Sequence, residues 1–105
     1  MATMSKLTIA EALGVLRTDR QSYMRLLERS DFDVGMYKPE RVDNQTLHTR
    51  DEVYVIAAGT GEFVCQGEKT TFGQGDVLYA PAGVEHQFLN FSDDFTTWVI
   101  FIGAR

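Results

Sequence analysis

The chain has almost no cysteine: Cys65 is the only one in 105 residues, so no disulfide can form within the chain. Residues 63–66 around it carry no basic side chain, so we expect a small buried apolar residue rather than a reactive thiol. Stability must then come from a hydrophobic core. A hydrophobic content of 44%, with seven Phe, four Tyr and one Trp, predicts a folded globular domain of ordinary size.

Long apolar runs and clusters of positive charge are also missing. No run is long enough to span a membrane, and residues 1–20 lack the uninterrupted apolar core of a signal peptide. Ten basic residues face fifteen acidic ones, for a net charge of −5, and no Lys/Arg cluster suits a nucleic-acid backbone. We therefore expect a cytoplasmic protein with neither a membrane nor a nucleic-acid partner.

The first 31 residues carry helical signals. Thr8 and Glu11 have the spacing of a capping box, in which each side chain bonds a free backbone N–H at the start of a helix. A second short helix is predicted from residue 21 or 22 to residue 28. We expect residues 1–31 to form a helical flap over an open end or the outer face of a barrel; the alternative is a lid or dimer surface. The apolar positions of the first helix are Ile9, Ala12, Leu13 and Leu16.

Residues 32–105 have the sequence pattern of short strands separated by turns that contain Gly, Pro and polar residues. This spacing predicts an all-β sandwich or barrel in a single domain. In the last strand, either Trp98, Ile100 and Ile102 or Val99 and Phe101 face the core. The expected strands lie near residues 34–37, 53–57, 62–66, 69–72, 77–80, 88–91 and 97–102, with a hairpin around Gly67.

The metal-binding chemistry lies in two distant places. His48 and His86 are the only histidines, and Glu52 lies close to the first of them. Two imidazoles and one carboxylate form the ligand set of non-haem iron sites and of several zinc sites. Strand alternation adds the residues that share a face with Glu52 or His86. The pocket-lining candidates are therefore Tyr54, Ile56, Phe88 and Asn90.

The spacing of glycine and proline around His86 makes the pattern specific. The second motif of the cupin family reads Gly, five residues, Pro, one, Gly, two, His, three, Asn. This chain has Gly75, Pro81, Gly83, His86 and Asn90 at those positions, so the sequence resembles a cupin. The resemblance covers roughly residues 34–102 and is greatest to small single-domain bacterial cupins.

The first cupin motif is matched only in part. It runs His, one residue, His, three or four, Glu, six, Gly, and this chain supplies His48, Glu52 and Gly59. Thr46 stands where the family has its first metal histidine, and it joins the pocket-lining candidates. The resemblance then leaves three alternatives: water completes a two-His-one-carboxylate site, Gln45 contributes its amide oxygen, or the site has lost its metal.

The resemblance implies an antiparallel double-stranded β-helix (a jelly-roll, RmlC-like barrel) holding one divalent ion, which is Fe, Zn, Mn or Ni. It implies a metal-dependent dioxygenase, isomerase or lyase acting on a small organic acid or carbonyl compound bound in the barrel. The alternatives are a non-catalytic module that binds a small molecule or sugar, and a metal that only stiffens the fold. No catalytic residue is assigned. A homodimer is expected, and Arg50 and Asp51 are expected to be solvated in a turn between His48 and Glu52.

Overall fold

The computed structural model describes residues 5–43 and 48–104. Within them no helix is long and apolar enough to cross a membrane. The described chain folds into α1 (Ile9–Asp19), β1 (Tyr23–Glu28), β2 (Phe32–Tyr37), β3 (Asp51–Ala58), β4 (Gly61–Cys65), β5 (Glu68–Phe72), β6 (Val77–Ala80), β7 (His86–Leu89) and β8 (Thr96–Ile102).

The first helix begins as its sequence predicts. Thr8 is the N-cap residue; its hydroxyl accepts from the Glu11 backbone N–H at 3.1 Å, and its own N–H donates to the Glu11 carboxylate at 3.2 Å. These two bonds satisfy donors that the first turn of a helix leaves free. The capping box is therefore confirmed.

The predicted second helix is wrong. Residues 23–28 form β1, which pairs antiparallel with β2. A β-bulge explains the error: the register shifts between Arg25 and Leu27, so the extra residue Leu26 breaks the alternation of the strand. Apolar residues then fall at positions that mimic the three-to-four spacing of a helix.

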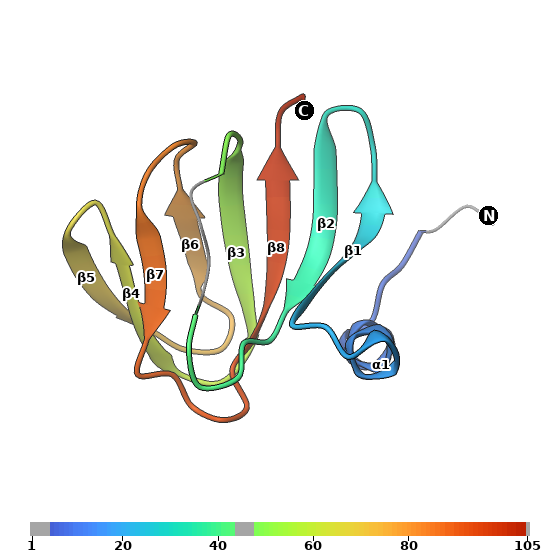
Figure 1. The fold of residues 1–105 in the computed structure, drawn as a ribbon, viewed down its shortest axis with the longest axis horizontal. Coiled ribbons are helices and arrows are strands. Elements are labelled where there is room, and N and C mark those ends of the chain that lie inside the picture. The colour runs from blue at the N-terminus through green and yellow to red at the C-terminus, as the bar shows by residue number, and fades with distance from the viewer. Residues whose placement is uncertain (1–4, 44–47, 105) are drawn as a thin grey trace.

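The strands form two antiparallel sheets that face each other. The larger sheet has the order β1-β2-β8-β3-β6, and the smaller has the order β5-β4-β7. Figure 1 shows the smaller sheet beside the β6 and β3 end of the larger one, with α1 at the far end. The all-β antiparallel fold predicted from the sequence is confirmed. Between the sheets lies one aromatic-rich core, which includes Tyr37, Tyr54, Ile56, Phe63, Phe72, Phe88, Phe95, Val99 and Phe101.

The hairpin predicted around Gly67 is also present. Cys65 pairs with Glu68 across a two-residue turn, and both turn residues, Gln66 and Gly67, have positive φ. Positive φ at both central residues is typical of a type I′ turn, whose twist matches the twist of the two flanking strands. Cys65 is half-buried at the end of β4, and burial, together with the Glu68 charge, raises the pKa of its thiol, which keeps it protonated.

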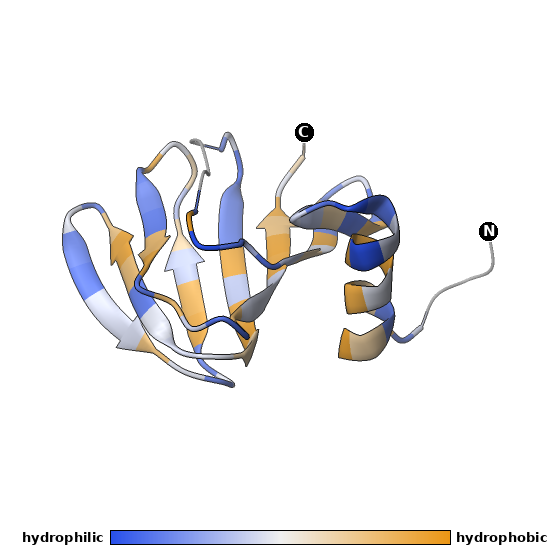
Figure 2. Cartoon of the chain, turned by 60° about the horizontal axis from the view of Figure 1, so that its bottom comes forward, coloured by the Kyte–Doolittle hydropathy of each residue, from blue (hydrophilic) through white to orange (hydrophobic). Residues whose placement is uncertain are grey.

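The last strand divides its side chains between two cores. Val99 and Phe101 face the smaller sheet, which settles the alternative that the sequence left open. Trp98 lies on the opposite face, where it packs with Met36 against Leu16 of α1. The helix therefore covers the outer face of the larger sheet, and Figure 2 shows its hydrophobic and hydrophilic stripes beside β1 and β2. The opposite face of the larger sheet lines the interior of the barrel.

Candidate functional site

Glu52 is placed inside the barrel by the alternation of β3. Its side chain is 1% exposed, and Tyr54 and Ile56, two and four residues on, are buried on the same face. The Tyr54 hydroxyl donates to Glu52 Oε2 at 2.7 Å. That bond occupies one carboxylate oxygen and leaves Oε1 to face the interior.

A turn brings the two histidines to Glu52 from distant parts of the chain. The Gly83 N–H, just before β7, donates to the His48 carbonyl at 2.6 Å, and the Ala82 N–H donates to the Asp51 carboxylate at 2.8 Å. Gly83 has φ of 72°, a left-handed conformation that favours glycine and accounts for its place in the motif. The segment entering β3 is thus tied to the segment entering β7.

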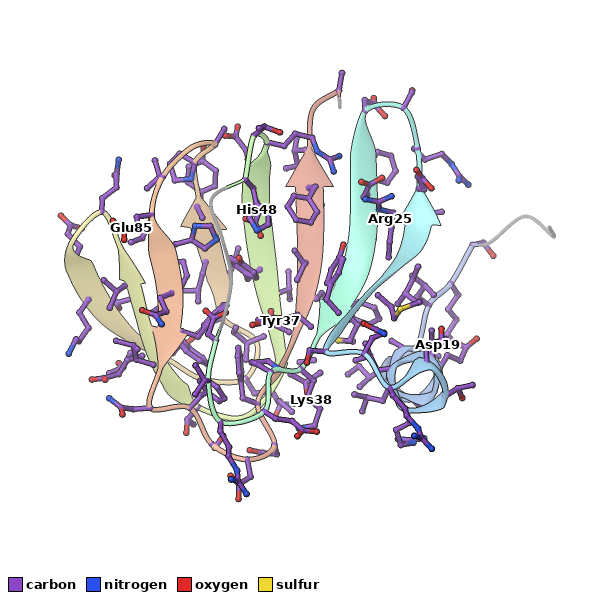
Figure 3. The ribbon with its side chains drawn as sticks, in the orientation of Figure 1. Asp19, Arg25, Tyr37, Lys38, His48 and Glu85 are labelled. Atoms are coloured by element: carbon purple, nitrogen blue, oxygen red, sulfur yellow. The ribbon has the colours of Figure 1, made fainter. Side chains whose placement is uncertain are left out.

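The three predicted metal ligands converge on one point. His48 Nε2 lies 3.3 Å and His86 Nε2 lies 3.1 Å from Glu52 Oε1, and all three ligand atoms lie within 4.8 Å of one another. A common ion about 2.0–2.2 Å from each donor places neighbouring donors about 3 Å apart. Glu52 and His86 are buried, whereas the His48 side chain is 31% exposed and lies over the β3 end of the sheet (Figure 3). The cluster thus has the spacing of a metal site with one face toward solvent.

The hydrogen bonding of His86 fixes what its ring presents to Glu52. Its Nδ1 lies 2.8 Å from the Val84 carbonyl oxygen, which only accepts, so Nδ1 carries a proton. In the neutral ring Nε2 then points a lone pair at Glu52 Oε1, and residues 5–43 and 48–104 offer neither atom another hydrogen-bond partner. Burial lowers the pKa of His86, but Glu52 and the Val84 carbonyl outweigh it, and the pKa is raised. A cation, either a proton or a metal, must lie between the two acceptors.

The other candidates from the sequence lie in different surroundings. Tyr54, Ile56 and Phe88 are buried in the aromatic core, and the Tyr54 ring lies 6.2 Å from that of His86. Asn90 is exposed beyond the end of β7, where its side chain donates to Glu62 at 2.6 Å. Gln45 and Thr46 lie outside the described residues.

Sequence reasoning missed an ion-pair cluster close to the predicted metal ligands. Asp33 is fully buried on β2, and its Oδ2 accepts from Arg50 at 2.8 Å and lies 3.4 Å from Arg25. The expectation that Arg50 is solvated is wrong, because its side chain is 12% exposed. Asp51 is partly exposed, and its carboxylate accepts from the Ala82 N–H. The alternation of β2 could have indicated that Asp33 is buried, because Asp33 lies on the same inward face as Tyr37.

A pocket of about 230 Å³ lies against this cluster. The Arg50 guanidinium lies 4.9 Å from the centre of the Phe101 ring, and the His48 ring lies 5.1 Å from the same ring. Burial raises the pKa of the Tyr23 hydroxyl, against the opposing effect of Arg25, so it stays protonated at neutral pH. The pocket is lined by Tyr23, Arg25, His48, Thr49, Arg50 and Phe101.

Gly35 makes room for the Tyr23 ring. A Cβ at Gly35 would lie 2.6 Å from Tyr23 Cε1 and 2.7 Å from the Met24 carbonyl oxygen, which belongs to the backbone and cannot move freely. Gly35→Ala is therefore expected to lower the free energy of unfolding by about 1–3 kcal/mol. Chemical denaturation measures it, with Gly73→Ala as control because a Cβ there has no atom within 4 Å. Equal stabilities would contradict the predicted contact.

Known proteins resemble the chain in both sequence and fold. The sequence profile of the family described as "Cupin domain" matches residues 34–103. The uncharacterized protein SCO3923 of Streptomyces coelicolor is 34% identical over 82 residues, which are 76% of this chain and 78% of that protein. KdgF from a Halomonas species superposes with a TM-score of 0.68 at 22% identity, over 79% of this chain and 78% of its own. An RmlC-like double-stranded β-helix protein from Methanocaldococcus jannaschii superposes with a TM-score of 0.67 at 13% identity, over 78% and 79% of the two chains.

Proposed function

The chain belongs to the cupin family, and from this premise we propose that it is a metal-dependent enzyme acting on a small organic acid or carbonyl compound. His48, Glu52 and His86 would hold one divalent ion, which would serve as Lewis acid and template for the substrate. The donor set suits iron, zinc, manganese and nickel alike. The proposal is therefore of a divalent ion and not of a particular element.

One observation carries the proposal: in the neutral form of the His86 ring, two buried acceptors, His86 Nε2 and Glu52 Oε1, face each other at 3.1 Å, and neither has another hydrogen-bond partner among the described residues. Such a contact costs free energy unless a cation neutralises it, and buried polar atoms in native proteins almost always have a partner. His48 Nε2 approaches the same carboxylate oxygen at 3.3 Å. Three atoms that can each donate an electron pair to a metal point at one place, and this arrangement fits a bound ion better than a single proton.

The surrounding residues support and orient the ligands. The Val84 carbonyl fixes the tautomer of His86, and the Tyr54 hydroxyl holds Glu52 Oε2. Both are the outer contacts that commonly set the direction and basicity of a metal ligand. Because both oxygens of Glu52 are engaged in this arrangement, its role is that of a ligand and not of a general base. The exposed side of His48 leaves an approach for substrate.

Metal loading tests the proposal. We expect purified protein to carry stoichiometric metal, and chelator-treated protein to gain thermal stability when Fe²⁺, Zn²⁺, Mn²⁺ or Ni²⁺ is added. At 100 times the Kd, binding adds about 2.7 kcal/mol of stability. His86→Ala should abolish this gain, because it removes a buried ligand. The measurements are elemental analysis and melting curves with and without each ion.

Glu85→Ala is the matched control, because Glu85 is adjacent to His86 but exposed. The metal-binding proposal fails if no ion raises the melting temperature, or if His86→Ala responds as the parent does. With metal bound, a panel of diketones, catechols and 2-oxo acids separates the reaction types. Oxygen uptake identifies a dioxygenase, conversion without oxygen identifies an isomerase or lyase, and binding without turnover favours a small-molecule-binding module.

A further inference from the structure

Four buried side-chain polar atoms in the described part of the chain have no hydrogen-bond partner, and they lie in one region. Two are Glu52 Oε1 and His86 Nε2; the others are the Tyr23 hydroxyl and Arg50 Nη1. Tyr23 and Arg50 both line the 230 Å³ pocket, together with the ligand residue His48. Native proteins leave few such groups unpaired, and those they leave call for an explanation. The metal accounts for the first pair but not for the second.

The Tyr23 hydroxyl and Arg50 Nη1 are hydrogen-bond donors, and they lie beside the ion pairs that Asp33 forms with Arg50 and Arg25. Asp33 occupies one nitrogen of Arg50, and the charge of Arg25 is shared between Asp33 and Glu28, each 3.4 Å away. Arg50 therefore keeps an N–H for which the described residues supply no acceptor. A guanidinium group suits planar oxyanions because it presents several N–H groups in a fixed fork. The protonated Tyr23 hydroxyl adds another donor.

The register of the larger sheet sets the distance from this pocket to the metal site. Asp33 and Glu52 both pair with Phe101, from opposite sides of β8, so the three residues lie in one row across the sheet. Neighbouring strands are about 4.8 Å apart, which puts Asp33 and Glu52 about 10 Å apart along the row. Arg25 and His48 lie toward the same end of the sheet (Figure 3). A molecule of a few carbons is long enough to reach from the arginine side of the pocket to the predicted metal site.

The pocket is large enough to hold a small acid. A volume of 230 Å³ equals that of about eight water molecules in the liquid, each of which takes about 30 Å³. The Phe101 ring forms an apolar wall between His48 and Arg50. A ligand in this space has one polar end at the arginine and an apolar middle against the ring.

We propose that Arg50 and Tyr23 bind a carboxylate of the substrate, while the rest of that molecule extends past His48 toward the metal. The substrate is thus a small organic acid with two oxygen-bearing ends. This inference rests on the proposed function, because the metal site receives the second end. Arg50 and Tyr23 determine specificity; they do not touch the reacting atoms.

The Tyr23→Phe variant distinguishes ligand binding from a purely structural role. A purely structural role predicts a lower free energy of unfolding and unchanged ligand binding. Among the described residues the Tyr23 hydroxyl has no partner of full hydrogen-bond geometry, and its one close polar neighbour, Arg25, also pairs with Asp33 and Glu28, so removal of the hydroxyl changes the free energy of unfolding little. If it donates to a bound carboxylate, the same change weakens ligand binding roughly tenfold, as expected for one bond to a charged group.

The test uses malonate as probe and its neutral analogue malonamide as comparison, on metal-free protein by calorimetric titration. We expect malonate to bind and malonamide to bind at least tenfold more weakly, since only malonate carries the charge that Arg50 recognises. Tyr23→Phe and Arg50→Lys should each weaken malonate binding. Tyr79→Phe is the control, because it removes an exposed tyrosine hydroxyl from β6.

Three results would each overturn the inference: no malonate binding, equal binding of malonamide, or unchanged binding by Tyr23→Phe. Because Tyr23→Phe is expected to fold as the parent does, the test does not depend on Arg50→Lys. Metal titration of the same samples keeps the two proposals apart. Metal binding without malonate binding rejects only the carboxylate pocket, and malonate binding without metal binding rejects only the metal site.

Discussion

Asp33→Ala is expected to lower the free energy of unfolding by about 3–5 kcal/mol, because it removes one partner of a buried ion pair. Asp33 is fully buried, and its carboxylate bonds the Arg50 side chain, which is 12% exposed. Without Asp33, the guanidinium remains in a poorly hydrated place without its counter-charge. For a domain of this size the loss is a large part of the total stability. Urea or thermal unfolding measures it.

Two further variants separate this effect from a general loss of packing. Arg25→Ala should cost less than about 1 kcal/mol, because its side chain is 42% exposed and its ion pairs are screened by solvent. The double variant Asp33→Ala/Arg50→Met should recover most of the loss, since an apolar side chain replaces the stranded charge. If the double variant is no more stable than Asp33→Ala alone, the buried charge is not the cause.

The overall fold was predictable because turns and strand alternation are local properties of the sequence. The pattern of Glu52, Tyr54 and Ile56 correctly places these residues on one inward face of β3. The glycine and proline spacing before His86 correctly marks a turn, and the bonds from Gly83 and Ala82 show why that turn reaches the segment after His48. The spacing of the motif therefore predicted that His48, Glu52 and His86 lie together.

The error in β1 and the missed ion pairs have a different cause. The bulge at Leu26 interrupts the alternation of inward and outward side chains along β1. The resulting spacing of apolar residues in 23–28 resembles that of a helix. The cluster of Arg25, Asp33 and Arg50 depends on which strands become neighbours, because β2 pairs with β8 from the far end of the chain. Sequence patterns give the face of a strand more readily than its neighbours.

Tyr54→Phe is expected to weaken metal affinity by about 10- to 100-fold, the usual effect of losing a group that orients a metal ligand. The Tyr54 hydroxyl holds Glu52 Oε2 at 2.7 Å, and without it the carboxylate is free to rotate Oε1 away from His48 and His86. Phenylalanine keeps the ring that packs on Phe88, so the core is preserved. Competition with a chelator of known affinity measures the change.

Tyr37→Phe provides the matched comparison, because the Tyr37 hydroxyl also donates to a buried carboxylate, that of Asp43. Asp43 in turn accepts from the Phe88 N–H and is not one of the converging ligands. Both variants should lose about 1–3 kcal/mol of stability in the metal-free protein, as each leaves a buried acceptor with one bond fewer. Only Tyr54→Phe should also lose metal affinity. Equal affinities in the two variants would mean that Tyr54 stabilises the barrel without orienting Glu52.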